Sequence, residues 1–412
     1  MFRLGYWRHE TQIEREAWPF RLSKDHSFYR RDYMGILNVS EKVNRHPLMI
    51  GNRIEALYDG EEAYPAMLEA IEKAEKFIYL CSYIFNSDET GLRFVKALAD
   101  AQKRGVQVWV LVDAFGELYS SRRISRILWR EGITCSRFLP LSLSLNSLHL
   151  NLRNHRKLLV IDGRLGFTGG MNIRDSHWAL GAQKKKMTDI QFKVQGPVVL
   201  ELQEVFLEDW YFATHESLSW LVHPHELLPG DSVCRIISGG PNEDFEKINW
   251  MLLGALAWSK NSVQIMTPYF VPDPVLISAL NTAALRGVLV EVILPEKNNL
   301  PFVAWANRAL HEEMVENEIK IYYQPAPFSH SKLFVVDSSY TLIGSSNWDA
   351  RSLRLNFELD LEIYDSNFSK EMSDYFVEVR DRAREVTLTE IKNDPLWMRF
   401  RDSFFKLFSP YL

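Results

Sequence analysis

Cysteine is scarce in this chain of 412 residues. The three cysteines, Cys81, Cys135 and Cys234, are far apart in the sequence and odd in number, and they show no Cys-x-x-Cys spacing. Such a set predicts neither a disulfide framework nor a zinc site, and it suits a reducing compartment. The histidines show no His-Glu-x-x-His pattern, and no glycine-rich nucleotide-binding motif is present. We therefore predict no metal and no nucleotide cofactor.

Long apolar runs are also missing. The longest, Trp250 to Trp258, is about half as long as a membrane-spanning helix. The N-terminus has no apolar stretch of the kind found in secretory leaders. The sequence thus predicts no transmembrane helix. Aromatic residues make up 13% of the chain, with 12 Trp. Because Trp and Tyr favour boundaries between water and apolar phases, attachment to a membrane surface stays open.

A strong net charge is absent as well. The 48 Lys and Arg nearly balance the 53 Asp and Glu, which gives a net charge of −5. This balance argues against a general polyanion binder, and we expect no nucleic-acid partner. Hydrophobic residues make up 46% of the chain, enough for a sizeable core. The length predicts two or three domains.

The strongest feature present is an internal repeat. Two segments read His-x-Lys-x4-Asp-x6-Gly-[Gly/Ser]-x-Asn with equal internal spacing. The first contains His155, Lys157, Asp162, Gly170 and Asn172, and the second contains His330, Lys332, Asp337, Ser345 and Asn347. Two full copies are much harder to obtain by accident than one His-x-Lys tripeptide, which alone is typical of an ordinary strand.

The flanks of the two motifs repeat too. Residues 77–85 resemble 263–270, and each segment is followed by a helical pattern that ends at Arg104-Gly105 or Arg286-Gly287. Apolar, β-branched runs come next. This order predicts an α/β fold with two homologous domains, each a mixed β-sheet flanked by helices. The predicted boundaries are 1–48 for an N-terminal segment of unknown role, 49–212 and 231–390 for the two domains, 213–230 for their connection, and 391–412 for a C-terminal amphipathic helix.

The motif residues suit phosphoryl chemistry. With a period of two along a strand, His155 and Lys157 point to one side, and so do His330 and Lys332. If a pseudo-twofold axis packs the halves together, two imidazoles and two ammonium groups meet in one pocket. The lysines would neutralise a phosphoryl group, while one imidazole attacks phosphorus and the other protonates the leaving alkoxide. No metal is needed for this.

The duplicated motif resembles the signature of the phospholipase D superfamily. Residues 154–172, 267–273 and 351–358 further resemble the bacterial cardiolipin synthases, and the resemblance covers about residues 49–412. It implies two phospholipase D-like domains with the active site at their pseudo-twofold interface.

The resemblance also implies residue roles. His155 would be the nucleophile that forms a phosphatidyl-histidine, and His330 the general acid and base, although the residues themselves do not decide which histidine attacks. The phosphate oxygens would be held by Lys157, Lys332, Asn172, Asn347 and Ser345. Glu358 matches a carboxylate that hydrogen-bonds a catalytic imidazole, and Asp189 looks like its counterpart in the first half.

Two departures and one structural expectation accompany this resemblance. Asp162 and Asp337 belong to the motif, but their place at a strand end predicts a structural role. Gly170 stands where the second copy has Ser345, which removes one hydroxyl donor. Typical members begin with two transmembrane helices, whereas this chain begins with about 48 mostly polar and aromatic residues.

The implied activity is that of a cardiolipin synthase. One phosphatidylglycerol would donate its phosphatidyl group to another and release glycerol, and phosphatidylethanolamine could replace one of the two. The enzyme would lie peripherally on the cytoplasmic face of a bacterial inner membrane. The alternatives are a phospholipase D-type phosphodiesterase, acting as a lipid hydrolase or a nuclease, and a membrane-bound scaffold that has lost catalysis.

The C-terminus offers one candidate for membrane attachment. Asp394-Pro395 is a good helix start. A single helical face then carries Trp397, Phe400, Phe404, Leu407, Phe408 and Tyr411. Arg399, Arg401 and Lys406 would supply positive charge for anionic headgroups. The alternative is a terminal helix packed on the core of the protein.

Overall fold

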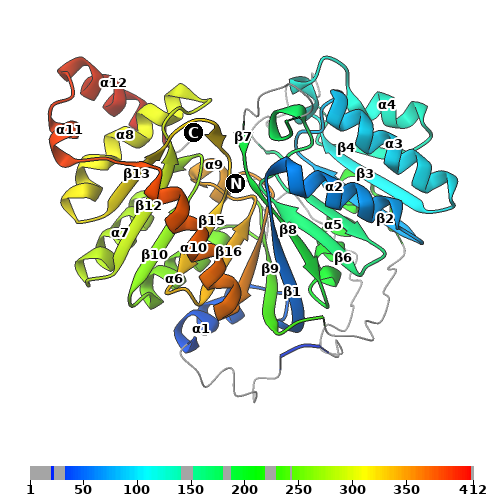
Figure 1. Ribbon diagram of the computed structural model, residues 1–412, viewed down its shortest axis with the longest axis horizontal. Coiled ribbons are helices and arrows are strands. Elements are labelled where there is room, and N and C mark those ends of the chain that lie inside the picture. The colour runs from blue at the N-terminus through cyan, green and yellow to red at the C-terminus, as the bar shows by residue number, and fades with distance from the viewer. Residues whose placement is uncertain are drawn as a thin grey trace.

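The computed structural model describes residues 20–22, 33–140, 152–179, 187–218, 229–241 and 244–409, which form two halves with the same order of elements (Figure 1). The first half contains β1 (Met49–Tyr58), α2 (Asp59–Glu72), β2 (Phe77–Ser82), α3 (Glu89–Lys103), β3 (Gln107–Asp113), the 3-10 helix η3 (Gly116–Tyr119), α4 (Ile124–Arg130), β4 (Thr134–Phe138), β5 (Leu158–Ile161), β6 (Leu165–Gly169), the 3-10 helix η5 (Asp175–His177), β7 (Met187–Thr188), β8 (Ile190–Gln195) and α5 (Val199–Thr214).

The second half repeats this order. It contains β9 (Ser232–Gly239), α6 (Lys247–Trp258), β10 (Ser262–Met266), β11 (Phe270–Val271), α7 (Pro274–Leu285), β12 (Leu289–Pro295), α8 (Pro301–Glu316), β13 (Lys320–Gln324), β14 (Phe328–Ser329), β15 (Leu333–Val336), β16 (Tyr340–Gly344), β17 (Trp348–Asp349), α9 (Ala350–Arg354), β18 (Glu358–Tyr364), α10 (Ser366–Asp381), β19 (Arg384–Glu385), α11 (Leu388–Lys392) and α12 (Leu396–Lys406). Helix α1 (Met34–Val43) precedes both halves.

The repeated helices begin and end with repeated local signals. The Asp88 carboxylate accepts the Gly91 N–H at the start of α3, and the Asp273 carboxylate accepts two N–H groups at the start of α7. Gly105 and Gly287 follow the last residues of these helices with φ angles of 94° and 89°, values that a residue without Cβ adopts freely. The predicted stops at both Arg-Gly pairs are confirmed.

The two predicted sheets are joined into one. The strand order is β19-β13-β12-β10-β15-β16-β18-β9-β1-β8-β6-β5-β2-β3-β4, and the halves meet where β1 pairs antiparallel with β9. Within each half the sheet is mixed: β2 is parallel to β3 and antiparallel to β5, as β10 is to β12 and β15. The prediction of a duplicated α/β fold with mixed sheets and flanking helices is confirmed.

The core also connects the halves. One buried cluster contains Phe206 and Trp210 of α5 together with Phe368 and Met372 of α10, and so draws on both halves. Because burial of each large apolar side chain contributes about 2 kcal/mol, this shared cluster holds the interface in one arrangement.

The first described segments of the chain pack on the second half. Leu22 and the α1 residues Ile36 and Leu37 join its core, while residues 1–19 and 23–32 of the predicted N-terminal segment lie outside the described residues. The same holds for 219–228 of the predicted connection, so the domain boundaries stay a prediction. Within the described ranges, no helix combines the length and the apolar character needed to cross a membrane.

Candidate active site

The first histidine lies on an extended segment that the second half holds. The His155 N–H donates to the Phe357 carbonyl at 2.9 Å, and the Phe357 N–H donates to the Arg153 carbonyl at 2.8 Å. His155 and Lys157 fall on one side, and the Lys157 ammonium donates to the His155 carbonyl at 2.5 Å. The sequence spacing predicted this shared side.

Arg156, between them, points the other way and binds the second half. Its guanidinium donates to the Glu358 carbonyl at 2.9 Å and to the Gly239 carbonyl at 3.1 Å, and it forms a buried ion pair with Asp209 at 2.6 Å. One residue of the motif thus ties its own strand to the partner half, while its two neighbours face the site.

The second histidine repeats this arrangement with the halves exchanged. Strand β14 pairs parallel with β7, and the His330 N–H donates to the Thr188 carbonyl at 2.8 Å. The Lys332 ammonium donates to the His330 carbonyl at 2.6 Å. The same ammonium lies 3.2 and 3.3 Å from the two ring nitrogens of His330.

Each imidazole is bound by a carboxylate from the opposite half. His155 Nδ1 lies 3.0 Å from Glu358 Oε2, and His330 Nδ1 lies 3.0 Å from Asp189 Oδ2. A carboxylate on Nδ1 fixes the tautomer, leaves Nε2 for the substrate and stabilises an imidazolium. The two halves therefore complete one site at their interface, as the resemblance implied.

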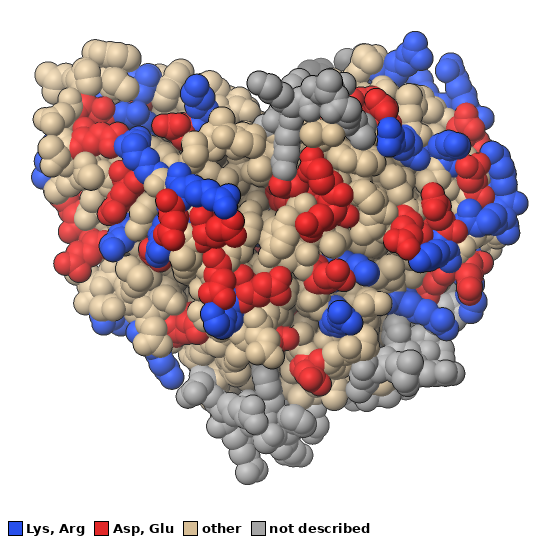
Figure 2. All heavy atoms as spheres, viewed as in Figure 1, with Lys and Arg blue, Asp and Glu red and all other residues tan. Residues whose placement is uncertain are grey.

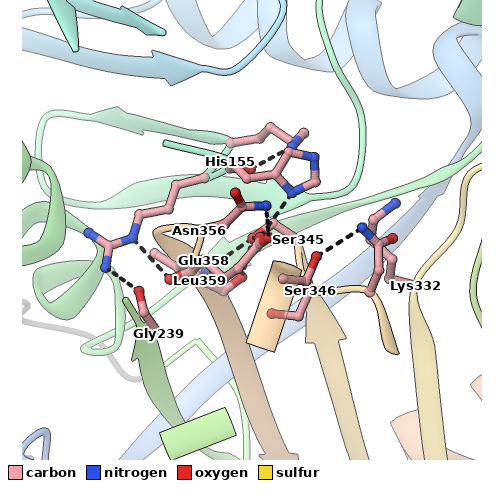
Figure 3. A network of polar contacts seen from close by, with 12 residues as sticks. His155, Gly239, Lys332, Ser345, Ser346, Asn356, Glu358 and Leu359 are labelled. Carbon is pink, nitrogen blue, oxygen red and sulfur yellow. Dashed lines mark hydrogen bonds and ion pairs between the residues drawn. The ribbon is translucent and has the colours of Figure 1, made fainter. Parts of the chain in front are cut away.

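Two further side chains hydrogen-bond the Glu358 carboxylate (Figure 3). The Ser345 hydroxyl donates to Glu358 Oε2 at 2.5 Å, and the Asn356 amide donates to Oε1 at 3.1 Å. Burial alone would raise the pKa of Glu358, but His155, Lys157 and the Ser345 hydroxyl bring it below its usual value. The Ser345 hydroxyl lies on this carboxylate, and its role in binding a phosphate oxygen stays a prediction.

The two motif asparagines lie beside the site and bind neighbouring loops. The Asn172 carbonyl oxygen accepts the Ile84 N–H at 3.1 Å, and the Asn347 amide donates to the Ser352 hydroxyl at 3.1 Å. Both are buried. Their role in phosphate binding stays a prediction.

The two motif aspartates lie away from the histidines. The Asp162 carboxylate accepts the backbone N–H groups of residues 75–77 at 2.8–2.9 Å, and Asp337 accepts those of residues 260–262 at 2.7–2.9 Å. Each carboxylate thereby satisfies the N–H groups where the neighbouring strand, β2 or β10, begins. This is the structural placement that their strand-end position predicts.

The site is buried and rich in cationic groups, which shifts its pKa values. Burial lowers the pKa of His155 to about 4, although Glu358 opposes this. Burial and the ammonium groups of Lys332 and Lys157 lower the pKa of His330 well below its usual value. Burial also lowers the pKa of Lys157 to about 7 and of Lys332 to about 8. An anion bound among these four groups would relieve their repulsion.

Three aromatic neighbours were not predicted as site residues. The Tyr83 ring lies 5.1 Å from the His155 ring, and Tyr269 lies 6.5 Å from His330. Both tyrosines lie in the repeated flanking segments. Their matching positions in the two repeats could have predicted them as site residues. His177 is buried with its ring 6.1 Å from His330, and neither of its ring nitrogens has a hydrogen-bond partner among the described residues.

Among the described residues, no three His, Cys, Asp or Glu side chains gather as a metal ion would require. Besides the two carboxylates that bind Nδ1 of each histidine, the polar groups of the site include imidazoles, ammonium groups and amides. These are the donors that bind phosphate oxygens.

Comparison with known proteins agrees with this geometry. A family model described as "Cardiolipin synthase, PLD-like domain" matches residues 67–210 and 252–380. The cardiolipin synthase of Geobacillus thermodenitrificans is 33% identical over 380 residues, which cover 92% of this chain and 76% of that protein. The major cardiolipin synthase ClsA of Bacillus subtilis is 33% identical over 402 residues, covering 96% and 82%.

A solved structure shows the same fold. The phosphatidylserine synthase of Haemophilus influenzae superposes with a TM-score of 0.71 at 17% identity, covering 92% of this chain and all of that one. The comparisons favour the predicted phosphatidyltransferase over the hydrolase and nuclease alternatives. The chain belongs to the cardiolipin synthase family of phospholipase D-like enzymes, as its duplicated motif predicted.

Proposed function

We propose that this chain is a cardiolipin synthase that transfers a phosphatidyl group from one phosphatidylglycerol to another and releases glycerol. One observation carries the proposal: two imidazole–carboxylate pairs, His155–Glu358 and His330–Asp189, each form across the interface beside a lysine. A pair of imidazoles with two ammonium groups can divide nucleophilic and acid–base work on one phosphodiester.

The first step would form a covalent intermediate. Lys157 and Lys332 bind the phosphate oxygens of the donor, whose negative charge raises the pKa of both imidazoles. His155 Nε2 attacks phosphorus while the bond to the glycerol oxygen breaks, and His330 gives that oxygen a proton. The phosphorylated imidazole keeps a proton on Nδ1, and its positive charge is stabilised by ionised Glu358.

The second step would reverse the proton movement. The primary hydroxyl of a second phosphatidylglycerol gives its proton to His330, and its oxygen attacks phosphorus. The bond between phosphorus and His155 Nε2 breaks, so that cardiolipin leaves and both histidines return to their starting state. The lysines stabilise the added charge of each transition state. Two displacements on one intermediate give ping-pong kinetics.

The proposal includes a location. Because both substrates are membrane lipids, we place the enzyme peripherally on the cytoplasmic face of a bacterial inner membrane. Protease treatment of right-side-out and inside-out membrane vesicles tests this. Cleavage in the inside-out vesicles alone is expected, and cleavage in right-side-out vesicles would contradict the placement.

Lipid mass spectrometry tests the reaction. Purified protein is incubated with phosphatidylglycerol vesicles, with and without phosphatidylethanolamine, and the His155→Ala variant is the control for contaminating activity. We expect cardiolipin and free glycerol in equal amounts. Phosphatidic acid without cardiolipin would mean that water takes the second step, and the chain would then be a hydrolase.

A further inference from the structure

Helix α12 presents an apolar face to solvent. Trp397, Phe400 and Leu407 are 64%, 76% and 74% exposed. The opposite face anchors the helix: Phe405 packs its ring 4.9 Å from Trp305 of α8, and buried Asp402 binds Arg308 at 3.1 Å. The anchoring contacts do not use the exposed face, which remains available to a partner.

The two arginines of α12 are engaged within the protein. Arg399 pairs with Glu312 at 3.0 Å, and Arg401 pairs with Asp402 at 2.6 Å. The sequence predicted that these arginines would serve anionic headgroups, and the structure corrects that expectation. Tyr411, on the same predicted face, lies outside the described residues. Helix α12 therefore offers apolar contact more than charge.

Positive charge gathers instead at the other half. Arg122, Arg123 and Arg126, at the start of α4, are exposed and form no ion pair in the part of the chain that the structure describes. Leu118 and Tyr119 of η3, just before them, are 50% and 58% exposed. We call residues 118–126 the arginine edge.

The arginine edge adjoins the first histidine. The Tyr119 ring lies 6.4 Å from Tyr83, and Tyr83 lies 5.1 Å from His155. One tyrosine thus separates this exposed edge from the proposed nucleophile.

Helix α12 lies on the side of the second histidine, with an apolar cluster between them. Phe405 and Tyr269 both pack against one buried cluster of Val271, Val303 and Ala306. The Tyr269 ring lies 6.5 Å from His330. Figure 1 shows α12 and α4 at the upper left and upper right, with β7 and α9 between them. Figure 2 shows Lys and Arg gathered at the upper right and a largely uncharged surface along the upper left margin.

We propose that the exposed face of α12 and the arginine edge form a two-sided docking surface for a bilayer that contains anionic phospholipid. The apolar side chains of α12 insert among the headgroups, where Trp is favoured. The guanidinium groups of the arginine edge bind headgroup phosphates. The bilayer then faces both histidines. This inference rests on the proposed function, because a phospholipid substrate must enter from the membrane.

Vesicle flotation tests the surface. The vesicles contain equal amounts of phosphatidylglycerol and phosphatidylcholine, or phosphatidylcholine alone. The triple variant Trp397→Ser, Phe400→Ser and Leu407→Ser is expected to bind both kinds at least about tenfold more weakly. The triple variant Arg122→Gln, Arg123→Gln and Arg126→Gln is expected to lose about tenfold on the anionic vesicles only, and high salt should mimic it.

Matched controls change equal numbers of exposed residues elsewhere. Trp250→Ser, Val275→Ser and Leu285→Ser remove three exposed apolar side chains of α6 and α7, and Lys96→Gln, Arg164→Gln and Lys320→Gln remove three positive charges. Both controls should bind as wild type. The inference would be overturned if the docking variants bound vesicles like the wild type. It would also be overturned if the control variants lost as much binding as the docking variants. A change of oligomeric state in the α12 variant, with wild-type vesicle binding, would assign that face to a second copy of the chain.

Activity on a water-soluble, short-chain phosphatidylglycerol separates this inference from the proposed function. The docking variants should turn over the soluble substrate at the wild-type rate and lose activity only on vesicles. A wild type that binds vesicles through these residues but produces no cardiolipin would contradict the proposed function and leave the docking surface standing.

Discussion

The two copies of the site share one pattern of backbone hydrogen bonds and differ in the groups that surround each carboxylate. In both, the residue before the histidine pairs with the other half, a carboxylate of that half binds Nδ1, and the lysine two residues on binds the histidine carbonyl. Glu358, however, receives the Ser345 hydroxyl and the Asn356 amide. Asp189 has Gly170 beside it instead, and burial raises its pKa.

A second difference follows two residues after the motif asparagines. Arg174 stands in the first copy and Asp349 in the second. Arg174 contributes to the lowered pKa of His330, after burial and the two lysines, while burial raises the pKa of Asp349 to about 7. The two copies thus share their geometry, but Glu358, the stronger anion, stabilises a phosphorylated His155 better than Asp189 would stabilise a phosphorylated His330. The two histidines should not be interchangeable.

The largest expected effect is the loss of either histidine. His155→Ala and His330→Ala should each lower kcat by about 10,000-fold or more, since each step needs both imidazoles. Radiolabelled phosphatidylglycerol assays measure the residual rate. A His155→Ala enzyme that keeps the wild-type kcat would contradict the proposed mechanism.

The carboxylates test the comparison directly. Glu358→Gln should lower kcat by about 1000-fold because the amide cannot stabilise a charged imidazole, as in serine proteases. Asp189→Asn should cost about tenfold less, since Asp189 is the weaker anion. Steady-state kinetics on the same vesicles give both values. Equal losses would show that the difference between the copies has no catalytic consequence.

The lysines come next. Lys157→Ala and Lys332→Ala should each cost about 2–4 kcal/mol of transition-state stabilisation, the usual effect of losing one oxyanion donor. The loss should appear in kcat/KM. Arginine at either position keeps the charge and supplies the control. If the alanine variants kept the wild-type kcat/KM, the lysines would not bind the phosphate in the transition state.

Ser345 and Gly170 offer a smaller, reciprocal test. Ser345→Ala removes one hydrogen bond to a charged group and should cost about 1.5 kcal/mol, roughly tenfold in kcat. Gly170→Ser should not supply the missing donor, because a Cβ there would lie 3.0 Å from both Asp189 oxygens. We expect it to lower activity. A more active Gly170→Ser enzyme would show that Asp189 can move to accept the hydroxyl.

The smallest expected effect is a fall in kcat/KM at high pH. A lysine loses its charge as pH rises through its pKa, and Lys157 and Lys332 do so at about 7 and about 8. The kcat/KM value, which reports the free enzyme, should therefore fall above pH of about 7–8. A bound phosphodiester raises both pKa values, so kcat should fall only at higher pH. A kcat/KM that stays flat across this range would contradict the lowered lysine pKa values.

The sequence predicted much of this site because its signals are local. Equal spacing placed His155 beside Lys157 and His330 beside Lys332, and a strand-end position separated Asp162 and Asp337 from the chemistry. The exchange of Glu358 and Asp189 between halves was not predicted, since it depends on pairing between segments some 140 and 200 residues apart. Spacing along one strand carries no information about that pairing.

The same limit explains the other misses. The joining of two sheets through β1 and β9 depends on a single antiparallel pair between the halves. The positive charge for a membrane was sought on α12 because Arg399 lies in an amphipathic pattern. Its partner Glu312 belongs to α8, a separate helix, so only packing reveals the pair.

The most direct test of the account is the site of the covalent intermediate. The wild-type enzyme is mixed with phosphatidylglycerol, quenched within one turnover under alkaline conditions that preserve phosphohistidine, and digested for peptide mass spectrometry. The account predicts a phosphatidyl adduct on His155, because Glu358 stabilises the charge that it carries. An adduct on His330, with none on His155, would contradict it.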